Sequence, residues 1–160
     1  SLVGSEMCIR DRLSTSYRNN QIICNLANKM YPDMEPCDSA MNVKTEHDGI
    51  FWIEEKDIDN YMETYKPMQL RYDRRTKVNA KFRVMTFGSA KGLTFDRVLI
   101  YPTQPMLTWL SGKSKGLKGE SLSKFYVAVT RAKYSVGFIY KTKKVPSEII
   151  GIKWTPNIDE

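Results

Sequence analysis

The chain has 160 residues and a mass of 18.5 kDa, which suffices for one domain with a substantial core. Apolar residues make up 41% and charged residues 27%, so the composition excludes a disordered or collagen-like chain. No apolar run approaches the ~20 residues of a membrane span, and three cysteines without a C-x-x-C pair exclude a disulfide framework and a zinc ribbon. We therefore expect a cytoplasmic protein with no membrane partner. The single histidine, His47, excludes a multi-histidine metal site, and its polar neighbours predict an exposed side chain.

The positive charge is concentrated in the later part of the chain. The formal net charge is +7, yet residues 13–65 carry four basic and ten acidic side chains. Residues 66–97 carry nine basic and two acidic side chains, and residues 98–160 carry ten basic and four acidic ones. A basic face predicts a polyanionic partner, such as nucleic acid or the phosphates of a nucleotide. The alternative is a solvated surface rich in lysine.

Hydrophobic periodicity predicts alternating helices and strands after residue 20. Helices are expected at residues 21–31, capped by Asn19 or Asn20, at 57–65, and at 121–133, capped by Ser121. Strands are expected at residues 50–53, 68–72, 82–87, 97–101 and 136–140, with loops at 32–42, 73–80 and 111–120. Near-continuous apolar strands between helices predict an α/β fold, with a mostly parallel sheet and helices on both of its faces.

The two ends of the chain differ from its centre. Residues 1–12 show neither helical nor strand periodicity, and the chain does not start at methionine. We expect these residues to be a non-native leader, such as a translated adaptor. Residues 13–145 are expected to form the domain, and residues 146–160 a C-terminal tail.

One short motif imitates a nucleotide-binding loop. Gly112-Lys113-Ser114 resembles the end of a phosphate-binding P-loop, but Leu107 stands where that loop needs its first glycine. The sequence contains neither a second P-loop candidate nor a convincing acidic magnesium motif at the end of an apolar strand. We therefore expect the chain by itself to be unable to hydrolyse a nucleotide.

Three other segments, in this order, carry a family signature. Residues 13–28 read LSTSYRNNQIICNLAN, residues 85–96 read MTFGSAKGLTFD, and residues 125–133 read FYVAVTRAK. They resemble motifs IV, V and VI of the UvrD/Rep/PcrA-type superfamily 1 DNA helicases, whose patterns are L-x-x-N-Y-R-S, T-x-H-x-x-K-G-L-E-F-D and Y-V-A-x-T-R-A-K. The resemblance implies the second RecA-like domain, of the P-loop NTPase type, of an ATP-dependent helicase. It also implies that ATP lies between this domain and an N-terminal RecA-like domain that holds the P-loop and Mg²⁺.

The resemblance assigns roles around ATP. Arg131, on the motif VI helix, corresponds to the arginine finger, and Arg18 to a second γ-phosphate contact, because a positioned guanidinium stabilises charge on the phosphate oxygens. Tyr17 corresponds to the aromatic residue that stacks on adenine, and Lys91 to a phosphate-side contact beside Gly92, where the backbone turns. The alternatives are an ordinary salt-bridged arginine for Arg131, a core-edge position for Tyr17 and a bond to loop carbonyls for Lys91.

Two positions in motif V depart from the family pattern. Gly88 stands where the family has a histidine near DNA, and Thr94 stands where it has a glutamate associated with the ribose. A threonine hydroxyl can bond a ribose hydroxyl, but more weakly than a carboxylate does.

Single-stranded DNA is the expected nucleic-acid partner. Its expected contacts are Thr86, Gly88 and Ser89 in motif V, and Lys113 and Lys115 in the Gly/Lys-rich loop. Phe87 and Trp109 could stack on bases, but we expect both to be buried in the core.

We therefore expect the chain to supply γ-phosphate arginines and part of the DNA track for ATP-driven translocation and unwinding. The alternative is a non-catalytic RecA-like DNA-binding module of a larger nuclease/helicase assembly. Gly88 and Thr94 leave room for that alternative. Retention of Arg18, Lys91 and Arg131 together counts against it, because a site that does not hydrolyse ATP has no chemical use for all three residues.

Overall fold

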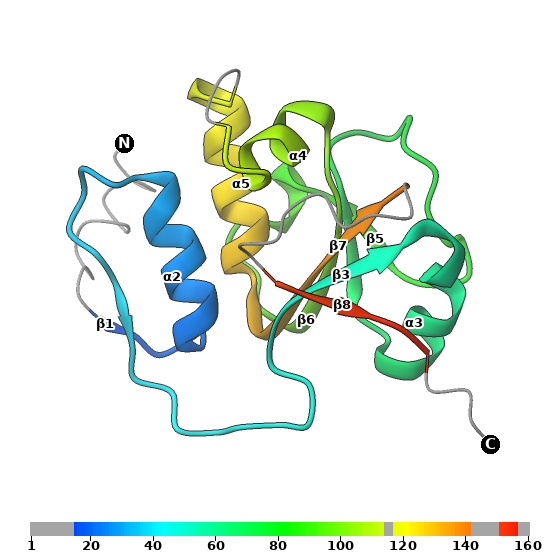
Figure 1. Ribbon diagram of the computed structural model, residues 1–160, viewed down its shortest axis with the longest axis horizontal. Helices are drawn as coiled ribbons and strands as arrows, with labels where there is room; N and C mark the ends of the chain where they lie inside the picture. The colour runs from blue at the N-terminus through cyan, green and yellow to red at the C-terminus, as the bar shows by residue number, and fades with distance from the viewer. Residues whose placement is uncertain (1–14, 114–116, 142–150, 157–160) are drawn as a thin grey trace.

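A six-stranded sheet forms the centre of the protein (Figure 1). The computed structural model describes residues 15–113, 117–141 and 151–156. Its strands lie in the order β5–β4–β6–β7–β3–β8, and every described pair of neighbours is parallel. The strands are β3 (Gly49–Glu54), β4 (Met68–Arg71), β5 (Val84–Thr86), β6 (Phe95–Tyr101), β7 (Ala132–Tyr140) and β8 (Ile152–Trp154). A separate parallel pair consists of β1 (Thr15–Ser16) and β2 (Asp38–Ser39).

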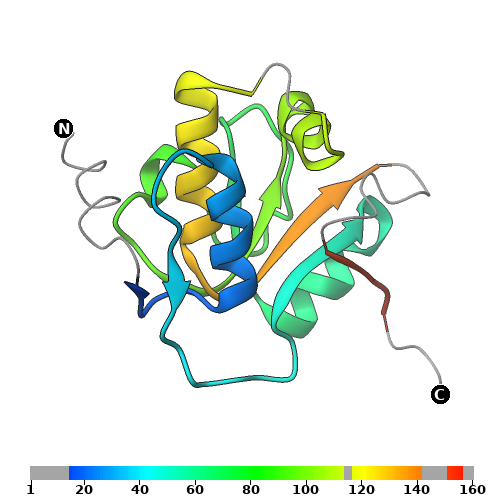
Figure 2. The same cartoon turned by 60° about the vertical axis from the view of Figure 1, so that its left-hand side comes forward.

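Helices cover both faces of the sheet, as the sequence predicts. The helices are α2 (Gln21–Met30), α3 (Ile58–Tyr65), α4 (Gln104–Leu110) and α5 (Gly119–Thr130), with short 3₁₀ turns η1 (Glu55–Asp57) and η2 (Gly88–Ala90). Val98 and Ile100 of β6 pack with apolar residues of α2, α4 and α5, which lie on one face. Leu99 of β6 packs on the other face with Tyr61 and Met62 of α3. Figure 2 shows α2 and α5 side by side against the sheet.

Helix α2 begins where its capping residue predicts. The side-chain oxygen of Asn20 accepts a hydrogen bond from the backbone N–H of Ile23 at 3.0 Å, which satisfies one of the free amides of the first turn. Ile23, Leu26 and Met30 recur at helical spacing and are buried. The sequence therefore determines both the start of this helix and the face that it buries.

Helix α5 differs from the prediction at both ends. The expected cap at Ser121 is wrong, because the helix begins two residues earlier at Gly119, and Glu120 in its first turn pairs with Lys124 at 3.1 Å. At the other end the helix stops at Thr130, because Ala132 already pairs with Phe95 of β6. Arg131 is consequently the residue between helix and strand and does not lie on the helix.

Several elements of the structure are absent from the prediction, namely helix α4, strand β8 and the short strands β1 and β2. Helix α4 contains Pro105 in its first turn, where a missing N–H breaks no helical bond, and Met106 and Leu110 fill the core one turn apart. Strand β8 lies within the expected C-terminal tail and pairs with β3, with Phe51 opposite Ile152. Of the helices in the described ranges, none has the length and apolar character needed to cross a bilayer.

His47 is buried, so the expectation of an exposed side chain is wrong. Only 4% of its surface is exposed, and its ring is stacked between those of Phe51 and Tyr65, with centroid distances of 3.8 Å to each. Its Nε2 forms a hydrogen bond with the hydroxyl of Tyr61 at 2.8 Å, and its backbone carbonyl accepts one from Arg97. Burial, with a smaller effect from the Arg97 charge, lowers the pKa of His47 to about 4. The aromatic residues that enclose the ring come from β3 and α3, so local polarity could not indicate this environment.

The buried histidine makes folding stability depend on pH. In the unfolded chain His47 has a pKa near 6.5, and in the folded chain it has one of about 4, so the unfolded state binds the proton more readily. Its contribution is complete above pH 6.5 and is lost as the pH falls from 6.5 towards 4. Between pH 7.5 and pH 5 we expect the free energy of unfolding to fall by about 2 kcal/mol through this group.

Urea unfolding at the two pH values measures this loss, and His47→Gln is the control because glutamine does not titrate. The difference between pH 7.5 and pH 5 should shrink in the variant by about 2 kcal/mol. An equal pH dependence in both proteins would show that His47 titrates normally in the folded state.

Candidate functional site

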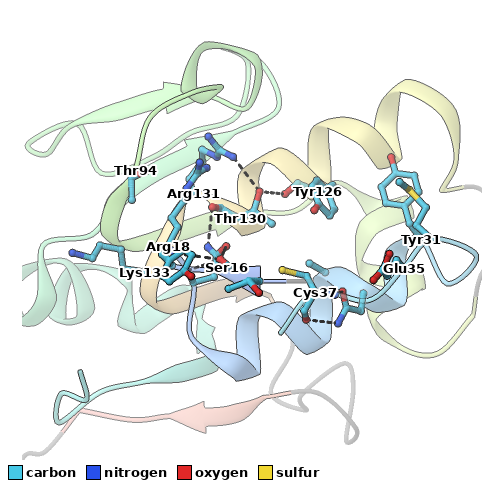
Figure 3. A pocket seen from close by; sticks show the side chains of 16 residues that line it. Ser16, Arg18, Tyr31, Glu35, Cys37, Thr94, Tyr126, Thr130, Arg131 and Lys133 are labelled. Atoms are coloured by element: carbon cyan, nitrogen blue, oxygen red, sulfur yellow. Dashed lines mark hydrogen bonds between the residues drawn. The ribbon is translucent and has the colours of Figure 1, made fainter. Parts of the chain in front are cut away.

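A cavity of about 670 Å³ lies at the amino ends of β6 and β7. Four stretches of sequence form it: the turn between β1 and α2, the end of α2 with the residues that follow it up to Cys37, residue Thr94 just before β6, and the junction of α5 with β7. Tyr17, Arg18, Thr94 and Arg131 line this cavity together. The fold thus brings four of the residues that the sequence assigns to ATP into one site. Figure 3 shows their surroundings.

Arg131 is held at the cavity by backbone carbonyls. Its side chain is 8% exposed; Nε donates to the carbonyl of Val127 at 3.0 Å, and a terminal nitrogen donates to that of Leu93 at 3.0 Å. The other terminal nitrogen donates to the hydroxyl of Thr130 at 3.3 Å. Its positive charge at the carboxyl end of α5 is favourable, because the carbonyls of a helix end carry partial negative charge. The guanidinium therefore has a fixed location beside the cavity.

Tyr17 and Arg18 project from the turn between β1 and α2. The hydroxyl of Ser16 accepts hydrogen bonds from the backbone N–H groups of Arg18 and Asn19, each at 3.2 Å, which fixes the turn. Tyr17 is 80% exposed, so the alternative of a core-edge position is wrong for this residue. Both side chains lie at the cavity and are accessible to a ligand.

The loop between β5 and β6 contributes only its last residue to the cavity. Thr94 is exposed and lines it, whereas Lys91 and Gly92, although predicted at ATP, lie outside the lining. The loop runs from the carboxyl end of β5 to the amino end of β6, so its earlier residues do not reach the amino edge. Gly92 has a φ of +85°, and a Cβ there would meet no atom within 4 Å. The turn therefore needs glycine for its backbone conformation and not for a close approach.

The cavity is positively charged. Arg18, Arg131 and Lys133 line it, against one carboxylate, Glu35, among the described lining residues. In Figure 3 the side chains of Arg18, Thr94, Arg131 and Lys133 lie towards one end of the cavity, with Glu35 and Cys37 towards the other. Such a distribution suits a ligand with several negative charges at one end.

Sequence reasoning missed several lining residues. Lys133 belongs to β7, which begins at Ala132, whereas the sequence predicts a helix over residues 121–133, so its place at the cavity follows from the early end of α5. Tyr31 directly follows α2, and Tyr126 lies on α5. Their rings meet edge to face with centroids 5.4 Å apart. Burial raises the pKa of Tyr126 to about 12, so its hydroxyl keeps its proton at neutral pH. Nothing in the local pattern pointed to this pair.

The nucleic-acid contacts predicted in motif V lie at the opposite, carboxyl edge of the sheet. Thr86 ends β5, and its hydroxyl donates to that of Ser89 at 2.9 Å while accepting from the Ser89 N–H at 3.3 Å. Gly88 lies between them and is exposed. Phe87 is fully buried, as expected. Trp109 is only partly buried, because its ring packs against the edge of the core, edge to face on Phe125 with centroids 6.0 Å apart, so the expectation of a buried side chain holds only in part for this residue.

A second cavity of about 830 Å³ lies at the same edge, beyond the ends of β6 and β7. Lys113 lines it, but Thr86, Gly88 and Ser89 do not, and Lys115 falls outside the described residues. Three further cations line this cavity: Arg75, Lys77 and Lys141. The aromatic rings of Tyr101 and Tyr140, at the ends of β6 and β7, line it as well. In the described ranges, no group of three or more His, Cys, Asp and Glu residues could hold a metal ion.

Solved structures that resemble this fold include two viral helicases. Methylated nsp10, a helicase of the virus PRRSV, superimposes with a TM-score of 0.52 at 20% identity, over 82% of this chain and 24% of its own. An arterivirus nonstructural protein 10, also a helicase, superimposes with a TM-score of 0.50 at 20% identity, over 86% of this chain and 27% of its own. The chain thus spans about a quarter of the length of these viral helicases, and the likeness establishes the fold.

No curated protein sequence matches the chain. The model of the UvrD-like helicase C-terminal domain matches residues 52–143, which is more than half of the chain and includes two of the three motifs. On this match, and with the parallel RecA-like sheet in place, the chain belongs to the family of UvrD-like helicase C-terminal domains.

Proposed function

We propose that this domain is the second RecA-like half of an ATP-dependent helicase and that its amino-edge cavity binds the phosphates of ATP. Tyr17, Arg18, Thr94 and Arg131 come from three distant segments and line one positively charged cavity, and this convergence supports the proposal. ATP and the N-terminal RecA-like domain would close the cavity from its open side. That first domain would hold the P-loop and Mg²⁺.

Arg131 and Arg18 are the proposed catalytic residues. As the γ-phosphoryl group transfers, charge develops on its oxygens, and a guanidinium placed against them lowers the barrier. Arg131 now donates to the carbonyls of Val127 and Leu93. In the closed state it would exchange at least one of these partners for phosphate oxygens, which form stronger, charge-assisted bonds.

Tyr17 and Thr94 are the proposed contacts to the nucleoside. The exposed ring of Tyr17 offers a flat apolar surface on which adenine can stack, and the exposed hydroxyl of Thr94 can bond a ribose hydroxyl. Lys91 and Gly92 lie outside the cavity, so we do not include them among the ATP contacts.

We propose that single-stranded DNA crosses the carboxyl edge of the sheet. Thr86, Gly88 and Ser89 offer hydroxyl and backbone N–H groups to phosphates, and Lys113, Arg75 and Lys77 supply positive charge farther along this edge. ATP and DNA would then occupy opposite edges of one sheet, with the loop between β5 and β6 extending from one edge to the other.

The finger assignment predicts a specific kinetic effect. In the intact helicase, Arg131→Ala should lower kcat for ATP hydrolysis by about 10³-fold while the KM for ATP changes little, because the charge that this arginine stabilises develops in the transition state. Steady-state ATPase assays measure both parameters, and circular dichroism checks the fold, since Arg131 also holds two backbone carbonyls. Turnover within a few fold of the wild type would remove Arg131 from the chemistry.

The stacking assignment predicts an effect on binding. Tyr17→Ala should weaken ATP binding about tenfold, and Tyr17→Phe should keep wild-type affinity, because the ring provides the stacking surface. Titration of the intact protein with a fluorescent ATP analogue measures both affinities. The same loss in the phenylalanine variant would mean that the hydroxyl group, and not the ring, makes the contact.

The DNA track predicts a change in salt dependence. Lys113→Ala should weaken binding of single-stranded DNA modestly and reduce the slope of log Kd against log salt concentration by about one unit. Lys29→Ala is the control, because Lys29 is exposed on α2 and lines neither cavity. Equal slopes for Lys113→Ala and the wild type would exclude Lys113 from the track.

A further inference from the structure

Asn19 makes an unusual set of contacts for a residue in a turn. It is 7% exposed, and its side-chain nitrogen donates to the carbonyls of Thr130 at 2.9 Å and Ala132 at 2.7 Å. Its side-chain oxygen accepts from the hydroxyl of Ser16 at 3.1 Å. Two carbonyl oxygens require a donor, so the amide nitrogen must face them and the orientation of the side chain is unambiguous.

These contacts join the two segments that carry the arginines. Asn19 directly follows Arg18, and the two carbonyls that it binds belong to the residues on either side of Arg131. Asn19 lies 111 and 113 residues before the two residues whose carbonyls it binds. Its buried side chain therefore connects the turn that carries Arg18 with the junction that carries Arg131.

Motif IV of this chain differs from the family pattern at the two positions that flank Tyr17 and Arg18. The family pattern for motif IV reads Asn-Tyr-Arg-Ser, whereas residues 16–19 read Ser-Tyr-Arg-Asn, so asparagine and serine stand in exchanged positions. The bond from Ser16 to Asn19 keeps the two exchanged side chains in contact.

We propose that Asn19 is a positioning residue that holds Arg18 and Arg131 in register for the same phosphate group, an inference that rests on the proposed function. The two guanidinium groups come from separate segments, and each segment could shift against the other without this bridge. A displacement of about 1 Å at a reacting group can cost about 10²-fold in rate. Asn19 acts through the two arginines and does not itself touch the nucleotide.

The neighbouring Asn20 provides a matched control. Its side-chain nitrogen donates to the carbonyl of Tyr134 at 2.7 Å, and its side-chain oxygen caps α2. Asn20→Ala therefore removes a comparable bridge between the same two segments, but not one that flanks Arg131. A purely structural role for Asn19 predicts similar losses in both variants, whereas positioning predicts a kinetic loss in Asn19→Ala alone.

Steady-state ATPase assays on the intact helicase test the proposal. Asn19→Ala should lower kcat about 10²-fold with the KM for ATP within about threefold of the wild type, while Asn20→Ala should keep kcat within about threefold. In an Arg131→Ala background, Asn19→Ala should have little further effect, because one of the two arginines that it holds in register is gone. Equal kcat values for Asn19→Ala and Asn20→Ala, or Asn19 and Arg131 effects that simply multiply, would overturn the proposal.

Two safeguards keep the outcome interpretable. If Asn19→Ala does not fold, Asn19→Gln retains the amide but displaces it by one methylene, and it should also lower kcat while Asn20→Gln does not. A wild-type protein without ATP turnover would count against the proposed function itself, whereas an active wild type with unaffected Asn19 variants would count against Asn19 alone.

Discussion

The backbone between α5 and β7 is held by an unbroken series of hydrogen bonds. The carbonyls of residues 130–134 accept hydrogen bonds, in turn, from the side chain of Asn19, the backbone N–H of Phe95, the side chain of Asn19 again, and the backbone and side chain of Asn20. Buried carbonyls need partners, and few local ones exist where a helix gives way to a strand. Two consecutive asparagines from the start of the chain meet this need. The position of Arg131, and with it the amino-edge cavity, depends on the two bonds from Asn19 to the carbonyls on either side of that residue.

The same bonds order the rest of the sheet edge. Asn20 also caps α2, so the helix that packs beside α5 starts where its cap is tied to β7. The turn that carries Tyr17 and Arg18 precedes this cap directly. Helix α2, the turn and the α5–β7 junction therefore form one connected unit at the amino edge, and the cavity lies within it.

The loop between β5 and β6 links the two edges of the sheet. It begins with the hydrogen-bonded pair Thr86 and Ser89 at the carboxyl edge and ends with Thr94 in the amino-edge cavity. The carbonyl of Leu93, within this loop, accepts a bond from Arg131. A segment of fewer than ten residues thus contacts both proposed sites, because parallel strands place consecutive loop ends on opposite edges.

The sequence by itself determined the elements whose signals are local. Helical spacing and the Asn20 cap defined α2, apolar β-branched runs defined β3, β6 and β7, and the three motifs named four of the residues that meet in the cavity. Tertiary structure alone decided the burial of His47, the end of α5 at Thr130, the strand β8 and the bridge from Asn19 to the junction of Arg131. Each of these depends on partners distant in sequence: aromatic rings from two elements, the pairing of Ala132 with Phe95, and buried carbonyls that only a remote amide could satisfy. Periodicity and capping report what a residue's neighbours along the chain prefer, whereas burial and pairing are determined by which surfaces the fold brings together.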